Sequence, residues 1–303
     1  MSGQGRVPIT ERLHPDGPRL ERLGTAALLA RLHAGDREAV RAVSRALPSL
    51  TNLAGDAIAA LSAGGRLVYA GAGTSGRLAA LDAAECPPTF GVRASRVVAL
   101  VAGGPAALRR AIEGAEDDRA AARRAVRAAR VGPKDLLVAV SASGRTPYAT
   151  AAIAEARARG ARTALLTSNP GADAGADRLV VLDTGAERIA GSTRMKAGTA
   201  AKMALGLLST AVFVRLGAVR GGRMAALRGT NEKLRARAVR NVAALLGVGA
   251  AAARRYLVQA GWDVGVVVER HGRGVDLDRD RARAGAEAGA GAGAGARARA
   301  REE

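Results

Sequence analysis

The sequence predicts an α/β fold, in which a doubly wound parallel five-stranded sheet is flanked by N-terminal helices and a C-terminal helical unit. Three observations support this prediction. The apolar periodicity changes from helical to strand-like near residue 66. From there, short and almost continuously apolar runs alternate with alanine-rich segments of helical length. Such runs are typical of parallel strands buried on both faces, and the alternation predicts right-handed crossovers.

The elements follow in order along the chain. Residues 20–63 are expected to be helical, because apolar side chains such as Leu28, Leu32 and Val43 recur at helical spacing. The five strands are expected at 66–70, 96–101, 135–140, 162–167 and 178–182. Helices are expected between them at 75–84, 105–130, 147–159 and 170–175, followed by a long helix at 192–217 and further helices within 223–270.

This organisation suggests four parts. An N-terminal arm with helices occupies 1–60, the sheet domain 61–218, and a helical C-terminal unit 219–281. Residues 282–303 are expected to be disordered, because alternating alanine and glycine offer no apolar face and glycine is costly to order.

The composition indicates a globular cytoplasmic protein. Hydrophobic residues make up 48% of 303 residues, and no stretch approaches the roughly 18 unbroken apolar residues that span a bilayer. The opening "MSGQGRVPITERLHPDG" contains no apolar segment, so we expect no secretory signal. A single cysteine, Cys86, cannot form an internal disulfide, and with only three histidines in the chain we expect no zinc site and no other metal.

The formal net charge of +20 raises the alternative of a nucleic-acid-binding protein. Aromatic residues are only 2% of the chain, so little is present on which bases would stack. The basic residues are dispersed, and nearly all are arginine, with lysine only at Lys134, Lys196, Lys202 and Lys233. This pattern indicates GC-rich codon usage, and we expect no specific nucleic-acid partner.

Two loops of the same kind follow the first and third expected strands. The first, "GAGTSG" at 71–76, fits the dinucleotide fingerprint Gly-x-Gly-x-x-Gly, and the second is "SASGRTP" at 141–147. Glycines and a helix N-terminus together suit an anion, although ordinary tight turns remain the simpler interpretation of either loop alone. No carboxylate ends the second strand to bind a ribose, and no P-loop lysine is present. A small phosphorylated ligand therefore fits better than a nucleotide.

Several stretches, in order from about residue 60 to 247, carry a resemblance to a known family. They are "YAGAGTSGRLAALDAAECPPTFG", "VAGGPAALRRAIEGAEDD", "SASGRTPY", "TSNP", "GSTRMKAGTAAKMALGLLST" and "TNEKL". Together they resemble the N-acetylmuramic acid 6-phosphate etherases of the sugar isomerase (SIS) domain superfamily. The N-terminal arm departs from the family pattern, because His14 stands where asparagine is usual and Gly17 and Gly24 replace serines.

The resemblance implies an activity. Members cleave the D-lactyl ether of N-acetylmuramic acid 6-phosphate to N-acetylglucosamine 6-phosphate and D-lactate, without metal or nucleotide cofactor, as cytoplasmic homodimers that recycle cell-wall sugar. Alternatives on the same fold are a non-catalytic phosphosugar sensor of the glucokinase-regulator type and an aldose–ketose isomerase. Elimination of lactate and addition of water require one or two carboxyl groups and a site that binds the phosphate.

The resemblance also assigns site residues. Glu85 and Glu116 match the catalytic glutamates, with Glu85 as the acid for departing lactate and Glu116 as the partner for the C2 proton. On sequence alone, Glu85 would mark the end of a helix before Pro87, and Glu116 would be a surface residue at a helix start. The substrate- and phosphate-binding positions are Gly73, Thr74, Ser75, Gly76, Ser141, Ser143, Gly144, Thr146, Glu187, Ser192, Arg194 and Lys196.

Two further expectations concern single side chains. Ser192 is expected to cap the helix at 193–217. The cations Arg194 and Lys196 would then oppose the helix dipole in its first turn, which indicates a nearby anion or carboxylate. Cys86 has no histidine near it in sequence and is interpreted as a packed thiol rather than a nucleophile.

Overall fold

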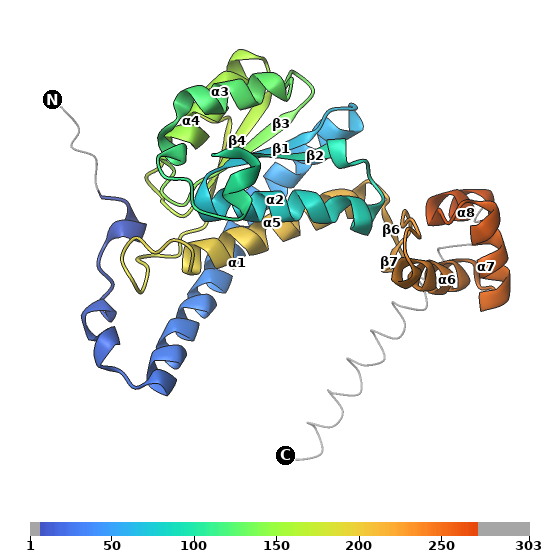
Figure 1. Ribbon diagram of the computed structural model, residues 1–303, viewed down its shortest axis with the longest axis horizontal. Coiled ribbons are helices and arrows are strands. Elements are labelled where there is room, and N and C mark those ends of the chain that lie inside the picture. Colours follow the sequence, from blue (N-terminus) through green and yellow to red (C-terminus); the bar gives the residue numbers. More distant parts are fainter. Residues whose placement is uncertain (1–6, 272–303) are drawn as a thin grey trace, which may run out of the picture. The chain divides into compact units, whose positions relative to one another are not determined.

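Five parallel strands in the order β2-β1-β3-β4-β5 form the centre of the fold (Figure 1). The computed structural model describes residues 7–271, and all five predicted strands are confirmed within it. They are β1 (Leu67–Gly71), β2 (Val97–Val101), β3 (Leu136–Val140), β4 (Arg162–Thr167) and β5 (Arg178–Val181). β1 pairs with β2 on one side and β3 on the other, so the chain changes direction across the sheet at β1. Ligands bind α/β sheets at such a switch point.

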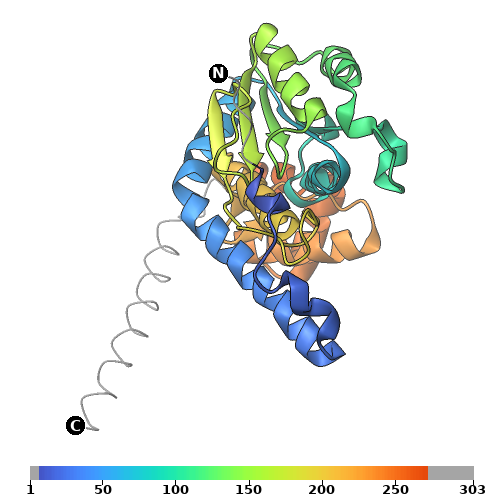
Figure 2. The ribbon, with the colours of Figure 1, turned by 90° about the vertical axis from the view of Figure 1, so that its left-hand side faces the viewer.

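Helices cover both faces of this sheet (Figures 1 and 2). One face carries α3 (Arg119–Ala128) and α4 (Pro147–Ala158), and the other carries α1 (Thr25–Ser62), α2 (Gly73–Phe90) and α5 (Lys196–Arg215). The strand side chains alternate between these layers, as the period of two requires. Val68 and Leu137, which are register partners on β1 and β3, pack with α3 and α4, whereas the hydroxyl of Tyr69, the next residue on β1, reaches α2.

The long helix α1 is fixed to the sheet by a buried carboxylate. Asp56 accepts hydrogen bonds from the guanidinium groups of Arg162 on β4, at 2.6 Å, and Arg178 on β5. The N-terminal half of α1 extends beyond the sheet, where the short 3-10 helices η1 (Ile9–Glu11) and η2 (Gly17–Arg22) precede it (Figure 2).

Two predicted helices between strands were wrong. The segment 105–130 contains the 3-10 helices η4 (Gly104–Leu108) and η5 (Ala115–Asp117), and only α3 is α-helical; η3 (Ala94–Arg96) precedes β2. Glycines with positive φ at Gly103, Gly104 and Gly114 interrupt the helix. The segment 170–175 forms turns without a helix, in keeping with its Pro170-Gly171 start.

Two helix boundaries also differ from prediction. α2 continues beyond residue 84 through Pro87 and Pro88 and ends at Phe90, so Glu85 lies within the helix. The prolines are tolerated in this last turn, and Phe90 stacks on Phe213 of α5 with ring centroids 4.9 Å apart. α5 begins at Lys196, because residues 192–195 form turns.

Helix α5 is long and apolar enough, by length and composition alone, to cross a membrane. In the fold it packs between α1 and α2, and 56% of its most apolar window is buried inside the protein. A helix in the core of a protein is also long and apolar. The apolar composition of α5 is therefore explained by its packing between α1 and α2.

The structure divides after Arg220 into two units, each described here by itself. Two-residue strands β6 (Val219–Arg220) and β7 (Arg223–Met224) lie at the division. The second unit contains α6 (Glu232–Leu246), α7 (Ala250–Gln259) and α8 (Val264–His271), which surround a small apolar core that includes Leu227, Val242 and Leu257. The tail expected to be disordered, 282–303, lies outside the described residues.

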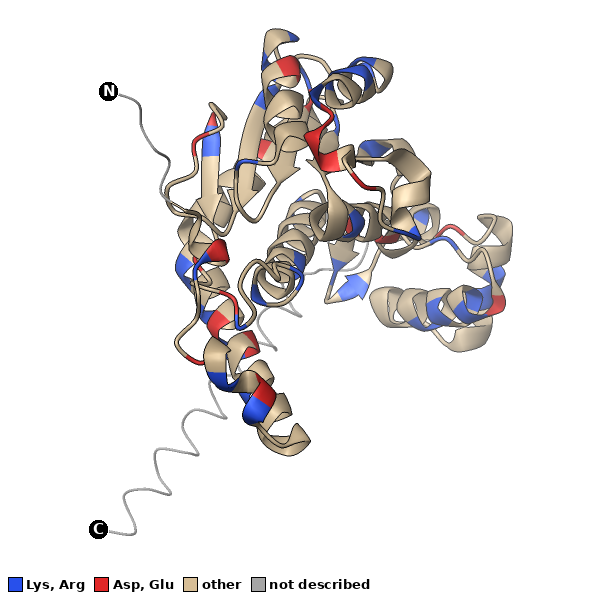
Figure 3. Cartoon of the chain, turned by 60° about the vertical axis from the view of Figure 1, so that its left-hand side comes forward, with Lys and Arg blue, Asp and Glu red and all other residues tan. Residues whose placement is uncertain are grey.

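Charged residues are intermixed rather than segregated by sign. Figure 3 shows blue and red segments alternating along the N-terminal half of α1. Ion pairs account for part of this mixing, for example Arg31 with Asp16 at 3.2 Å and Arg66 with Asp135 at 2.6 Å.

Candidate active site

The first loop forms the N-terminus of α2 directly after β1. The helix starts at Gly73, and its first helical bond runs from the N–H of Gly76 to the carbonyl of Ala72 at 3.1 Å. The N–H groups of Gly73, Thr74 and Ser75 come before that bond and are not used by the helix itself. They can therefore donate hydrogen bonds to an anion. Gly76 is required by packing, because a Cβ there would lie 2.6 Å from the carbonyl oxygen of Gly71.

The second loop brings its hydroxyl groups together at the start of α4. The hydroxyls of Ser141 and Thr146 lie 2.8 Å apart, and Ser141 Oγ accepts a hydrogen bond from the N–H of Gly144 at 3.1 Å. Ser143 Oγ accepts from the N–H of Arg145 at 3.2 Å. Gly144 has a φ of +69°, which explains the glycine in the turn. The predicted hydroxyls are thus held in one cluster before any ligand binds.

The two loops meet above the ends of the strands around a small hollow, which we call the strand-end hollow. Its volume is about 10 Å³, enough for roughly one water molecule. Ser75 contributes from the first loop, and Ala142 lines it beside Ser141 of the second. The hollow also brings in Ser168 after β4 and Thr193 before α5, two hydroxyl residues that the sequence analysis did not assign.

Glu116 lies in η5, in the segment that follows β2, and its side chain is exposed. This segment leaves the same edge of the sheet as the two loops, since β1, β2 and β3 are parallel. η5 also packs against α4, which starts at the second loop. Glu116 thus stays on the loop side of the sheet without a hydrogen bond to another residue in the 7–271 range.

Glu187 provides the carboxylate that the first turn of α5 was expected to attract. Its side chain is buried and accepts hydrogen bonds from the N–H groups of Lys196, at 3.1 Å, and Ala197, at 2.9 Å. Burial raises the pKa of Glu187, while these two backbone donors oppose that rise. The prediction that Ser192 caps α5 was therefore wrong: the helix starts four residues later, and Glu187 occupies the capping role.

Lys196 is engaged within the fold. Its ammonium donates to Glu38 of α1 at 2.5 Å, and its stem lies across Gly35, where a Cβ would approach to 3.0 Å. Arg188 donates to the other oxygen of Glu38, at 2.5 Å. Arg194 is exposed and has no hydrogen bond to any residue that the structure describes. Of the two predicted cations, only Arg194 therefore presents its charge to solvent.

The N-terminal arm joins the same ionic cluster through its unusual histidine. Arg188 Nη1 donates to His14 Nε2 at 2.7 Å and to Asp16 at 2.7 Å. Burial is the main cause that lowers the pKa of His14, and the charges of Arg188 and Lys196 lower it further. His14 thus serves as a neutral acceptor that attaches the arm to the segment before α5.

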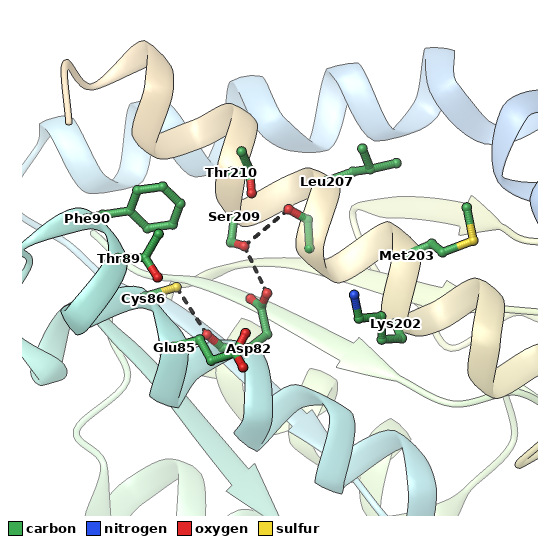
Figure 4. A pocket seen from close by; sticks show the side chains of 11 residues that line it. Asp82, Glu85, Cys86, Thr89, Phe90, Lys202, Met203, Leu207, Ser209 and Thr210 are labelled. Carbon is green, nitrogen blue, oxygen red and sulfur yellow. Dashed lines mark hydrogen bonds between the residues drawn. The ribbon is translucent and has the colours of Figure 1, made fainter. Parts of the chain in front are cut away.

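Glu85 lies in a different cavity, between α2 and α5, which we call the α2–α5 pocket (Figure 4). Its volume is about 410 Å³. The lining residues are Asp82, Glu85, Cys86, Thr89, Phe90, Lys202, Met203, Gly206, Leu207, Ser209 and Thr210. The Glu85 side chain is exposed toward this space.

A half-buried acid lies at the base of this pocket. Asp82 accepts hydrogen bonds from Tyr69 Oη and from Ser209 Oγ, each at 2.9 Å. Burial raises the pKa of Asp82, and the two hydroxyl donors oppose that rise. Burial also raises the pKa of the Cys86 thiol to about 12, which confirms a packed thiol rather than a nucleophile.

One chain does not bring Glu85 to its own phosphate loops. Glu85 follows Ser75 by ten residues on α2, which corresponds to about 15 Å along the helix axis. The strand-end hollow and the α2–α5 pocket share no lining residue. Within one chain, Glu85 is therefore separated from the loops, whereas Glu116 lies in a segment that leaves the loop edge of the sheet.

Asp82 and Lys202 are charged residues of this pocket that were not predicted from the sequence to belong to a site. Asp82 precedes Glu85 by one helical turn, a relationship that becomes visible only when the helix is taken through Pro87 and Pro88. Lys202 is one of four lysines in an arginine-rich chain, in the middle of an otherwise apolar helix. Among residues 7–271, no group of three or more His, Cys, Asp and Glu side chains is placed to hold a metal ion.

Comparison with known proteins identifies related families and sequences. Residues 50–157 match the glucokinase regulatory protein N-terminal SIS domain, and residues 120–211 match the SIS domain. A protein of Deinococcus radiodurans named N-acetylmuramic acid 6-phosphate etherase is 51% identical over 84% of this chain and 84% of its own. One of the same name from Geobacillus thermodenitrificans is 46% identical over 84% of this chain and 87% of its own. Among solved structures, a phosphoheptose isomerase from Francisella tularensis has a TM-score of 0.47 and 16% identity, covering 64% of this chain and 100% of that chain.

Proposed function

The chain belongs to the N-acetylmuramic acid 6-phosphate etherase family, and we infer that it cleaves the D-lactyl ether of N-acetylmuramic acid 6-phosphate. The products are N-acetylglucosamine 6-phosphate and D-lactate. The observation that carries this conclusion is the identity of 51% with a named etherase over most of both chains.

The reaction is an elimination followed by addition of water. In the open-chain sugar, the C1 aldehyde acidifies the C2 proton, so that a carboxylate base can remove it. The C3–O bond then breaks as a C2–C3 double bond forms, and a carboxylic acid gives its proton to the departing lactate oxygen. Water adds to the double bond, with its hydroxyl at C3 and a proton at C2. General acid–base help of this kind contributes about 10²- to 10⁴-fold per group.

We assign the roles as follows. Glu116, beside the loops, removes the C2 proton, and Glu85 protonates the lactate oxygen and later activates water. The phosphate is held by the hydroxyls of Ser75, Ser141, Ser143 and Thr146 and by the N–H groups of Gly73 and Thr74, with Gly76 and Gly144 shaping the turns. The hydrogen-bonded cluster of the second loop supports this assignment, because it holds the hydroxyls of Ser141 and Thr146 side by side, where they can donate to phosphate oxygens.

The segment before α5 has a supporting role in this proposal. Glu187 and Lys196 fix the start of α5, next to Thr193 and Gly198 of the strand-end hollow. Arg194 remains available to an anionic ligand at that edge. Ser192 lies in the turn that positions Arg194.

We propose a homodimer in which Glu85 of one protomer serves the phosphate loops of its partner. The separation of about 15 Å along α2 supports this arrangement, because a hexose phosphate held at Ser75 does not reach Glu85 of the same chain. Apolar side chains that a monomer leaves exposed also support it, for example Leu47 on α1 and Leu207 on α5, which line a groove of about 440 Å³. The free, buried Cys86 is in keeping with a reducing compartment, and we place the reaction in the cytoplasm.

Two single variants test the assignment of the glutamates. D-lactate release and deuterium uptake at C2 from heavy water are measured for Glu85→Gln and Glu116→Gln. Glu116→Gln should lose both signals by at least about 100-fold, because no base removes the C2 proton. Glu85→Gln should lose lactate release by a similar factor and retain more of the deuterium uptake. Full lactate release by Glu85→Gln would overturn its role.

A further inference from the structure

Lys202 faces the two acids of the α2–α5 pocket from the opposite helix. Figure 4 shows its ammonium directed from α5 into the space that Asp82 and Glu85 border from α2. Ser209, two helical turns further along α5, donates to Asp82 and fixes the two helices in this relation. Lys202 is the basic residue among those that line this pocket.

Lys202 forms no ion pair among the described residues, although its charge opposes the rise in the pKa of Asp82. Within the described part of the chain, no carboxylate oxygen lies within 4.0 Å of its ammonium. Lys196, one turn and a half earlier on the same helix, is in contrast buried against Glu38. Asp82 already has both of its oxygens occupied by Tyr69 and Ser209. An exposed cation that faces a cavity without an ion pair to a neighbouring carboxylate is available to a ligand.

The substrate class supplies a matching group. A lactyl ether carries its carboxylate on the carbon bonded to the ether oxygen, so this carboxylate accompanies the oxygen that an acid must protonate. A group that protonates the ether oxygen therefore has the lactyl carboxylate as its immediate neighbour. In a pocket that already contains Asp82 and Glu85, a third carboxylate is repelled unless a cation offsets it.

We propose that Lys202 binds the carboxylate of the lactyl group and thereby selects ether substrates that carry an acid. The proposal rests on the proposed function, specifically on Glu85 as the acid at the ether oxygen. Lys202 donates N–H groups to the carboxylate, holds the lactate while the C3–O bond breaks, and offsets its charge as it leaves. A sugar phosphate with a neutral ether side chain gains nothing from this contact.

The test crosses two enzymes with two substrates. The enzymes are the wild type and Lys202→Met, and the substrates are N-acetylmuramic acid 6-phosphate and its analogue in which the lactyl carboxylate is a neutral carboxamide. For the wild type, kcat/KM should favour the acid by about 10- to 100-fold, the range of a hydrogen bond between charged groups. For Lys202→Met, kcat/KM for the acid should fall by about that factor, and kcat/KM for the amide should change by less than about threefold.

Two further variants make the outcome unambiguous. Lys202→Arg keeps the charge and should retain most of the preference for the acid. Lys134→Met removes an exposed lysine from the turn before β3 and should leave both substrates unchanged. An equal fall for acid and amide in Lys202→Met, or no fall for either, overturns the proposal. Absence of D-lactate release from the acid by the wild type would instead overturn the proposed function.

Discussion

Ser75 and Glu85 lie on the same helix, ten residues apart, and face two cavities that have no residue in common. Ser75 borders the strand-end hollow at the start of α2, and Glu85 borders the α2–α5 pocket near its end. A rigid helix keeps them about 15 Å apart along its axis. In the proposed homodimer, a substrate that needs both groups would therefore receive them from different protomers.

Mixing two inactive variants tests this consequence. Ser75→Asp places a negative charge in the first turn of α2, where it suits the helix dipole and repels phosphate, so the variant should fold and be inactive. Glu85→Gln should also be inactive alone. After subunit exchange, half of the dimers are mixed, and each mixed dimer has one intact shared site of two. Lactate release should then recover to about one quarter of the wild-type rate. Mixed dimers without recovered activity would contradict a shared site.

The sheet could be predicted from the sequence because its signal is local. Each strand is a short apolar run, and burial on both faces leaves little room for another interpretation. The helical segments were harder to predict, because alanine is compatible with a helix almost anywhere. Whether such a segment is helical then depends on the backbone conformation of its glycines. Gly103 and Gly114 have positive φ, which divides the segment after β2 into short turns. These interruptions depend on tertiary packing that a periodicity does not contain.

The loops of the candidate site could be predicted from the sequence. The side-chain contacts that hold the start of α5 in place could not. Glycines and hydroxyls after two strands indicated an anion site, and the structure places both loops at one edge of the sheet. The carboxylate expected near the start of α5 is that of Glu187. It accepts a hydrogen bond from the N–H of Lys196, nine residues later in the chain, and the segment between them is irregular. The contact of Lys196 with Glu38 spans 158 residues, and no spacing rule predicts it. Side chains that support a site through distant contacts require the fold to be known.

The His14–Arg188 contact should make stability depend on pH below about 6.5. His14 is neutral in the folded state because burial, and then the charges of Arg188 and Lys196, lower its pKa, against the opposing carboxylates Asp16 and Glu38. As the pH falls through the ordinary value of 6.5, the unfolded chain takes up a proton that the folded chain resists. Unfolding is therefore favoured at acid pH, by at most about 1.4 kcal/mol per pH unit.

The variant His14→Asn isolates this contribution, because asparagine can accept from Arg188 without titrating in this range. Urea unfolding of both proteins is measured at pH 7.5 and 5.5. The free energy of unfolding of the wild type, relative to that of His14→Asn, should decrease at the lower pH. A difference that stays constant between the two pH values would show that His14 is not held neutral.

Two glycines of the phosphate loops should respond differently to the same substitution. Gly73 and Gly144 both have positive φ, at +53° and +69°, so alanine strains the backbone by about 1–2 kcal/mol at either position. Only Gly144 also lacks space: a Cβ there would lie 2.3 Å from the Cβ of Ala172, whereas a Cβ at Gly73 meets nothing within 4 Å. Overpacking in a buried turn adds about 1–3 kcal/mol. The free energy of unfolding, measured in urea, should therefore be lower for Gly144→Ala than for Gly73→Ala by about 1–3 kcal/mol. Equal free energies of unfolding for the two variants would mean that the 141–146 turn moves away from Ala172 without cost.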